Sequence, residues 1–335
     1  MKDSTNISLF AVACVVSVLI IASIACGSFR ETVPIAADEV VDVIQEPIAD
    51  EPETGQEIYQ VGDLVNLQNS TFVVLGWEKV TRLAFSEPDP GFLFVIIDLV
   101  VVNTGDSPRS ISSMQTSLRD ETSQSYETDF TGALINEGGR IDGVLLPGEK
   151  VRGKVRFQVP EDVQRLNFTF IADTLQSEVI FVDLGAEPVM VEAPSEIPGE
   201  REQKIYNIGD SVEINNLILT VNKVFSHSGD QHYQPSEGYK FILVDLTIEN
   251  KSAESVRISS FGQMSIKDSA SRRFIVDLRA TSAADGYLLN GNYAAGITVD
   301  SQAGFEVKED ETMFVFSFES SPWADWKVFV EIPLE

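Results

Sequence analysis

The sequence predicts an all-β fold in which one sandwich or barrel unit occurs twice. Residues 91–103 read Gly-Phe-Leu-Phe-Val-Ile-Ile-Asp-Leu-Val-Val-Val-Asn, and residues 238–250 read Gly-Tyr-Lys-Phe-Ile-Leu-Val-Asp-Leu-Thr-Ile-Glu-Asn. Both segments are rich in β-branched and aromatic residues and are too short and turn-bounded for a helix, so each is expected to be a long strand. Elsewhere, short apolar runs alternate with Gly, Pro, Asn and Asp turn signals, and helical periodicity is absent.

The repeated strand also predicts which side chains enter each core. Successive side chains of a strand point to opposite faces. We therefore expect one face of each copy to be buried: Val95, Ile97, Leu99 and Val101 in the first, and Ile242, Val244, Leu246 and Ile248 in the second. Asp98 and Asp245 recur on the opposite face, where we expect them to meet solvent and blunt the strand.

Length and charge limit the classes of function. The 335 residues provide for two ordinary domains plus tails. A formal net charge of -28 repels nucleic acid phosphates and anionic membrane surfaces, so no nucleic-acid partner is expected. The only two cysteines, Cys14 and Cys26, lie in or beside an N-terminal apolar run, which leaves the predicted folded units without a disulfide or a thiol nucleophile.

Residues 1–26 are interpreted as a signal or lipoprotein leader. The run from Leu9 to Ala25 is almost entirely apolar and ends in Ser23-Ile24-Ala25-Cys26-Gly27, which resembles a bacterial lipobox. This resemblance implies lipidation at Cys26 and a lipid anchor in the cell membrane. An uncleaved N-terminal membrane helix and simple secretion are the alternatives, and all three place the rest of the chain outside the cytoplasmic membrane.

Residues 27–57 are predicted to be an acidic, disordered tether. Between Glu31 and Glu57 there are nine acidic residues, no basic ones and three prolines. Such a segment repels itself and lacks the apolar content needed to offset the entropy of ordering. It therefore predicts an extended spacer next to the membrane.

The first folded unit is expected at residues 58–185 and the second at 205–335, joined by a Pro- and Glu-rich linker at 186–204. Tyr59-Gln60-Val61-Gly62-Asp63 recurs 147 positions later as Tyr206-Asn207-Ile208-Gly209-Asp210, which indicates duplication of a domain. Besides the repeated pair, strands are predicted at residues 71–77, 114–119, 150–159, 166–171 and 179–184, and at 211–213, 217–224, 264–267, 273–278, 305–307, 313–318 and 327–332.

These motifs resemble an immunoglobulin-like, telokin-like family of bacterial secreted and lipid-anchored proteins, a domain of unknown function. The resemblance rests on the Tyr59 to Asp63 motif, the Phe94 to Asn103 strand, and Leu146-Pro147-Gly148-Glu149 with the residues that follow it. In the second unit, Val307-Lys308-Glu309-Asp310 is taken as the counterpart of that Pro-Gly turn. The resemblance implies two tandem immunoglobulin-like β-sandwiches and carries over no catalytic residue.

Two loops contain the candidate site residues. His227, Asp230 and His232 could ligate a transition metal, but their spacing matches no helical or hairpin pattern, and we expect neither a metal nor another cofactor. Trp323 and Trp326 could anchor a partner or stack on a sugar, although burial as a cap on the sandwich end is the favoured alternative. A serine hydrolase is disfavoured because the first unit has no histidine to act as base.

The sequence thus predicts a membrane-anchored extracytoplasmic protein that binds a protein or a cell-envelope component and is not an enzyme. The alternative is a structural spacer, or a stress-protective lipoprotein of the envelope, without a specific ligand.

Overall fold

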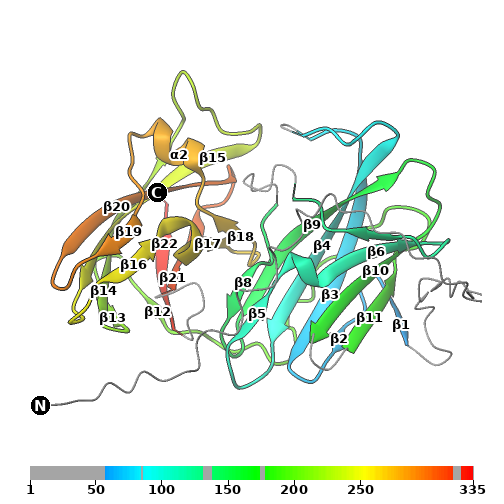
Figure 1. The fold of residues 1–335 in the computed structure, drawn as a ribbon, viewed down its shortest axis with the longest axis horizontal. Helices are drawn as coiled ribbons and strands as arrows, with labels where there is room; N and C mark the ends of the chain where they lie inside the picture. Colours follow the sequence, from blue (N-terminus) through cyan, green and yellow to red (C-terminus); the bar gives the residue numbers. More distant parts are fainter. Residues whose placement is uncertain (1–56, 84–85, 131–137, 174–177, 320–325, 335) are drawn as a thin grey trace, which may run out of the picture. The chain divides into compact units, whose positions relative to one another are not determined.

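The computed structural model describes residues 57–83, 86–130, 138–173, 178–319 and 326–334. The leader, its Cys26, most of the predicted tether and Trp323 lie outside these residues. Strands β1–β11 (blue to green in Figure 1) form one sandwich and β12–β22 (yellow-green to red) form another. Both fall within one compact unit, Ala49–Glu335.

The first sandwich packs two antiparallel-rich sheets face to face. One sheet has the order β1-β11-β10-β6-β7 and the other β2-β3-β4-β9, with β5 and β8 forming a small separate ladder. The strands are β1 (Ile58–Gln60), β2 (Val65–Asn66), β3 (Ser70–Val80), β4 (Phe92–Asn103), β5 (Arg109–Ile111), β6 (Thr116–Asp120), β7 (Ser125–Glu127), β8 (Gly143–Leu145), β9 (Lys150–Pro160), β10 (Leu166–Asp173) and β11 (Glu178–Asp183).

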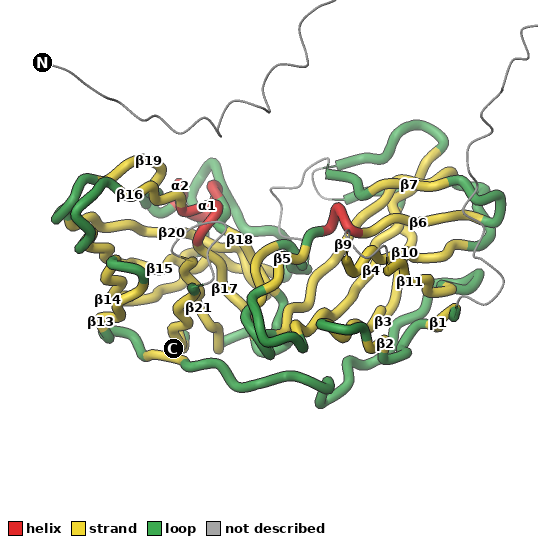
Figure 2. Tube along the Cα trace, turned by 60° about the horizontal axis from the view of Figure 1, so that its bottom comes forward, coloured by secondary structure: helices red, strands yellow, loops and turns green. Residues whose placement is uncertain are grey.

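The second sandwich repeats this arrangement with the orders β12-β22-β21-β17-β18 and β13-β14-β15-β20, plus the ladder β16-β19. Its strands are β12 (Ile205–Tyr206), β13 (Ser211–Ile214), β14 (Leu217–His227), β15 (Tyr239–Asn250), β16 (Val256–Ser259), β17 (Met264–Asp268), β18 (Arg273–Ile275), β19 (Asn290–Tyr293), β20 (Thr298–Lys308), β21 (Met313–Glu319) and β22 (Lys327–Pro333). Among the described residues, helix is confined to η1 (Ser113–Gln115), α1 (Ser260–Gln263) and α2 (Leu278–Ala283), which are red in Figure 2.

The core residues predicted on the repeated strand are confirmed. Val95, Ile97, Leu99 and Val101 of β4 all lie in the first hydrophobic core, and Ile242, Val244, Leu246 and Ile248 of β15 lie in the second. Each of these side chains is fully shielded from solvent. The predicted all-β fold with two tandem sandwiches is confirmed, although β4 is buried on both faces and not on one alone.

Duplication extends to single hydrogen bonds. Asn103, at the end of β4, donates from Nδ2 to the carbonyls of Ser107 and Leu145 at 2.8 and 2.9 Å, and its Oδ1 accepts from the Gly105 amide. Asn250, at the end of β15, makes the matching bonds. An asparagine with 1% exposure can be buried at both places because its amide is paired. The bulge of β3 between Val74 and Gly76 likewise recurs in β14 between Val221 and Lys223.

The predicted counterpart of the Pro-Gly turn is wrong. Gly148 has φ +77° and donates its amide to the Asn103 carbonyl, and Gly296 has φ +72° and donates to the Asn250 carbonyl. Both turns need a residue that tolerates the left-handed region, and glycine does so without strain. The second copy of the turn thus ends at Gly296, whereas Val307 and Lys308 belong to β20.

Two strand boundaries also differ from prediction, because a short capped helix occupies one end of each predicted strand. Met114, predicted as strand, lies in η1, where Ser112 and Gln115 form a reciprocal capping box, and β6 begins only at Thr116. The strand predicted at residues 273–278 ends at Ile275. Asp277 then caps α2 by accepting from the backbone amides of the next turn.

Residues 186–204 run along the first sandwich. The Trp77 amide donates to the Val189 carbonyl at 2.9 Å, and the Val191 amide donates to the Leu75 carbonyl at 2.7 Å. A Cβ at Gly76 would lie 2.2 Å from the Val189 carbonyl oxygen, so glycine permits this close approach. Ile197 packs on Val73, Leu75, Val100 and Val102 of the outer sheet face. This segment is therefore docked on the edge and face of one sheet.

Candidate functional site

The exposed Trp326 marks a cleft that is lined mainly by residues of the second sandwich. Its side chain is 63% exposed, so the predicted burial as a cap is wrong for this residue. The cleft has a volume of about 720 Å³. It is lined by Leu146, Gln203, Lys204, Tyr206, Val212, Glu213, Ile214, Asn215, Asn216, Trp326, Lys327, Val328 and Phe329.

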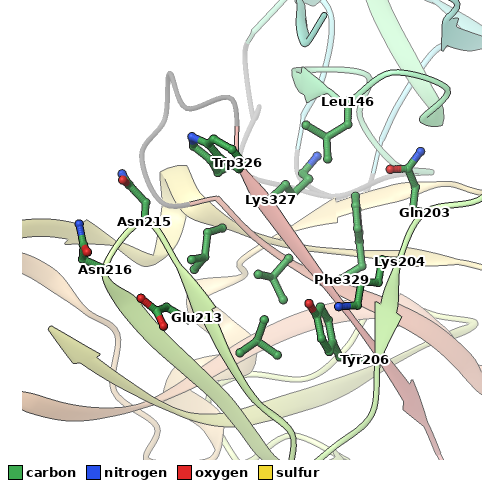
Figure 3. A pocket seen from close by; sticks show the side chains of 13 residues that line it. Leu146, Gln203, Lys204, Tyr206, Glu213, Asn215, Asn216, Trp326, Lys327 and Phe329 are labelled. Atoms are coloured by element: carbon green, nitrogen blue, oxygen red, sulfur yellow. The ribbon is translucent and has the colours of Figure 1, made fainter. Parts of the chain in front are cut away.

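The cleft combines an apolar floor with a polar rim. Val212, Ile214, Val328 and Phe329 are buried and supply the floor. In Figure 3, Glu213, Asn215 and Asn216 line one side, and Gln203, Lys204 and Tyr206 the other. Such a mixture of apolar surface and a few convergent polar groups is typical of ligand sites.

The asparagine pair belongs to a tight turn between β13 and β14. Asn215 and Asn216 have φ +48° and +64°, the left-handed values of a hairpin turn that asparagine tolerates. The amide of Lys251 donates to the Asn216 carbonyl at 2.8 Å, which holds the turn in place. Both side chains are exposed at the rim.

Behind the cleft lies a group of buried charged residues that we call the charge cluster: Glu149, Lys267, Arg273, Glu319 and Lys327. Lys327 Nζ lies 3.0 Å from Glu149 Oε1 and 3.2 Å from Glu319 Oε1, and Lys267 Nζ lies 2.5 Å from Glu149 Oε1. Arg273 Nη2 donates to Glu319 Oε1 at 3.0 Å. The cluster connects the first sandwich, through Glu149, with strands β17, β18, β21 and β22 of the second.

Two pKa values in the charge cluster are lowered, each for a different physical reason. Burial alone would raise the pKa of Glu149, but the ammonium groups of Lys267 and Lys327 outweigh it and hold this pKa at about 2. Burial lowers the pKa of Lys267 to about 8, against the attraction of Glu149 and with repulsion from Lys327. The neighbouring ammonium groups thus account for the lowered pKa of Glu149, and burial accounts for the lowered pKa of Lys267.

The charged groups of the charge cluster are mostly inaccessible to ligands. The cluster contributes to the wall of the cleft, and its charges are paired within the protein. Lys327 lines the cleft, but its ammonium donates to Glu149 and to the Val144 carbonyl. Among the described residues of the lining, Glu213 is the only carboxylate, and there is no His, Ser, Thr or Cys. The lining therefore offers a surface for stacking and several hydrogen-bonding groups.

The histidine loop is organised by its own backbone. His227 Nδ1 accepts from the Gly229 amide at 3.0 Å, and Asp230 Oδ1 accepts from the amides of His232 and Tyr233 at 2.8 and 2.6 Å. These amide bonds lower the pKa of Asp230. Within the described part of the chain, no three His, Cys, Asp or Glu side chains lie close enough together to hold a metal ion.

Asp98 is buried, so the prediction of a solvent-facing aspartate is wrong for the first copy. Its residue exposure is 6%, and Arg152 of the adjacent β9 donates to both of its oxygens at 3.0 and 2.8 Å. The docked residues 186–204 cover this outer face in the first sandwich. Asp245 of the second copy is half-buried and accepts from Asn222 and Gln302. Arg152 on the neighbouring strand is the partner that allows the Asp98 carboxylate to be buried. The local sequence pattern around Asp98 contains no sign of this partner.

The comparisons with known proteins assign the family. The domain of unknown function DUF4352 matches residues 59–179 and 206–328, one copy for each sandwich. The chain belongs to this family. The second DUF4352 match includes Trp326, Glu213 and the asparagine turn, whereas Gln203, Lys204 and Phe329 fall outside it.

Solved structures similar to these DUF4352 copies are distant in sequence. The yjhA protein of Bacillus subtilis is 19% identical, with 38% of this chain and 99% of that chain covered and a TM-score of 0.32. An uncharacterized β-sandwich protein of Clostridium difficile 630 is 11% identical, covering 40% and 98%, with a TM-score of 0.27. A lipoprotein candidate of Bacillus subtilis, ycdA, is 11% identical, covering 37% and 38%, with a TM-score of 0.31.

No curated protein sequence matches the DUF4352 chain. Across the described residues, no helix has the length and apolarity needed to cross a membrane.

Sequence reasoning missed the charge cluster. Glu149 follows a Pro-Gly turn, as many solvated acidic residues do, and its partners Lys267 and Lys327 lie in other strands of the DUF4352 repeat, far along the chain. The one available signal is Lys327 at the start of a strand-like apolar run. A lysine in that position more often faces solvent.

Proposed function

We propose that this chain is a non-catalytic binding protein of the cell envelope, held at the outer face of the membrane through Cys26, and that the Trp326 cleft is its ligand site. The observation that carries the proposal is an indole with 63% exposure beside an apolar floor and a rigid polar turn. Exposed tryptophans of this kind are over-represented among residues that dominate binding energy.

The anchoring part of the proposal rests on the leader. The apolar run and the lipobox-like Ala25-Cys26-Gly27 support lipidation at Cys26, and the acidic residues up to Glu57 would hold the sandwiches away from the membrane. In the host bacterium, we expect Cys26→Ser to abolish labelling by radioactive palmitate and to release the protein from the membrane fraction. Retention of Cys26→Ser in the membrane without label would support the uncleaved helix instead.

The binding part is tested with purified cell envelope. We expect the full-length chain, kept in a mild detergent, to bind envelope fragments saturably, and Trp326→Ala to bind them at least roughly tenfold more weakly, as truncating an aromatic anchor does. Tyr287→Ala is the matched control, because Tyr287 is 51% exposed and does not line the cleft. Equal binding by all three proteins would overturn the assignment of the cleft.

A second candidate is a structural spacer without a specific ligand. The charge cluster favours it, because buried ion pairs between the two sandwiches resist independent movement of either one. A spacer predicts that deletion weakens the envelope while saturable binding to envelope fragments is absent.

A further inference from the structure

The ligand class of the Trp326 cleft can be inferred from its lining, an inference that rests on the binding function proposed above. Trp326 presents a flat apolar ring at the rim, and the largely buried side chains of Val212, Ile214 and Val328 close the cleft below it. The C–H face of a pyranose ring is apolar, rigid and of similar size. Stacking it on an indole removes apolar surface from water without ordering a flexible ligand.

The polar rim matches hydroxyl groups. Asn215 and Asn216 each carry an amide with donors and an acceptor, held on a turn whose backbone is fixed in the left-handed region. Glu213 adds a carboxylate acceptor on the same side of the cleft. A sugar hydroxyl donates and accepts at once, so neighbouring hydroxyls can pair with this mixed set.

The charges of the site disfavour anionic ligands. Lys327 contributes its side-chain stem to the wall, but its ammonium is held by Glu149 and Glu319. The ammonium of Lys204 lies 4.5 Å from the Tyr206 ring centroid in a cation–π contact. The exposed charges of Lys204 and Glu213 balance each other in the lining, so the cleft has no local excess of positive charge to attract an anion, and the chain's net charge of -28 adds to the repulsion of phosphorylated or uronic-acid glycans.

An extended peptide is the less suitable occupant. Peptides bound through their backbone add to a free strand edge. The strand that lines this cleft, β13 (Ser211–Ile214), has only four residues and already pairs with β14 along its whole length on the other side. So short an edge supplies few backbone hydrogen bonds, whereas side-chain groups dominate the lining.

We propose that the Trp326 cleft binds an uncharged glycan, with one sugar ring stacked on the Trp326 indole and its hydroxyls bonded to Glu213, Asn215 and Asn216. The remaining wall residues exclude water from the stacked face. The site requires no metal and no acid–base chemistry, because recognition uses stacking and hydrogen bonds alone.

The test is a glycan array that carries uncharged hexose and N-acetylhexosamine oligosaccharides beside sialylated, sulfated and phosphorylated ones, probed with the full-length chain. We expect binding to uncharged members only, followed by calorimetry on the best of them. Trp326→Ala should weaken that affinity roughly tenfold or more, Trp326→Phe less, and Tyr287→Ala should leave it unchanged.

The outcomes separate the ligand class from the binding function. If no uncharged glycan binds, but envelope fragments bind in a Trp326-dependent manner and protease treatment of the fragments abolishes this, the sugar proposal fails and the binding function stands with a protein partner. If only charged glycans bind, the charge argument fails and the glycan class is overturned. If neither array nor envelope is bound, both proposals fall.

Discussion

Lys327 of the second sandwich donates to both carboxylate oxygens of Glu149 in the first, at 3.0 and 3.3 Å. Each side chain is 2% exposed. Glu149 also pairs with Lys267, and Lys327 also lies 3.2 Å from Glu319 Oε1, so losing Glu149 would leave three buried cations facing one carboxylate. Glu149 is therefore a sensitive point of the contact between the sandwiches.

Replacing Glu149 tests that dependence. Glu149→Gln keeps the shape but leaves Lys267, Lys327 and Arg273 facing the single carboxylate of Glu319, so we expect a loss of roughly 3–5 kcal/mol in the free energy of unfolding. Urea unfolding followed by tryptophan fluorescence measures it. The matched control is Glu78→Gln, which breaks a pair with Lys154 at 2.7 Å whose carboxylate is 46% exposed; its loss should stay below about 1 kcal/mol. Equal losses for both variants would contradict the prediction.

The pH dependence follows from the lowered pKa of Glu149. This pKa is about 2 in the folded chain, whereas an unfolded glutamate titrates near ~4.3. A carboxyl with a lowered folded pKa contributes stability that is complete above the unfolded pKa and is lost as pH falls towards the folded one. The stability gap between wild type and Glu149→Gln should therefore narrow from about pH 4.3 downwards. A gap that stays constant in acid-unfolding curves would speak against the ion pair.

The duplicated aspartates provide a matched comparison. Asp98→Asn replaces one of the two acceptors that Arg152 uses by a donor, and the burial at this position prevents water from replacing the lost bond. We expect a loss of roughly 1.5–3 kcal/mol, as for hydrogen bonds to charged groups. Asp245→Asn retains an acceptor for Asn222 or Gln302 at a half-buried position, so its loss should be about 1 kcal/mol or less. Thermal unfolding of the two variants ranks their losses of stability. A larger loss for Asp245→Asn than for Asp98→Asn would contradict the prediction.

Two glycines at matching places in the small ladders make another pair. Gly143 is paired with Ile111 and Gly291 with Ile258. A Cβ at Gly143 would lie 1.6 Å from Arg273 Nη1, and the guanidinium is held by Glu319, whereas a Cβ at Gly291 meets nothing within 4 Å. We expect Gly143→Ala to cost about 1–3 kcal/mol through overpacking, together with backbone strain because Gly143 has φ +139°. Gly291 is half-buried but has open space around its Cβ position, so Gly291→Ala should change stability by no more than ~0.5 kcal/mol. Similar unfolding midpoints for the two variants would show that Arg273 and its neighbours in the charge cluster can shift to accommodate the added methyl group.

More of the fold than of the candidate site could be predicted from the sequence. The alternation in β15 identified the side chains that face its core, and the repeat carried this assignment over to β4, which is itself buried on both faces. It could not place Asp98, whose burial depends on Arg152 from a neighbouring strand. It also could not indicate that Glu149 meets Lys267 and Lys327, because long-range ion pairs leave no periodic signal. Trp326 was identifiable as a candidate from its polar loop context, but its exposure depended on packing that only the tertiary structure contains.

The first and last strands of each sandwich run parallel: β1 beside β11, and β12 beside β22. A stretching force applied to the two ends of such a sandwich pulls these neighbours in opposite directions along their length. All the hydrogen bonds between the two strands are then loaded together in shear, instead of breaking one after another. A polypeptide fixed at one end and loaded at the other by flow or by its surroundings would therefore keep both sandwiches closed under tension that would peel an antiparallel terminal pair apart.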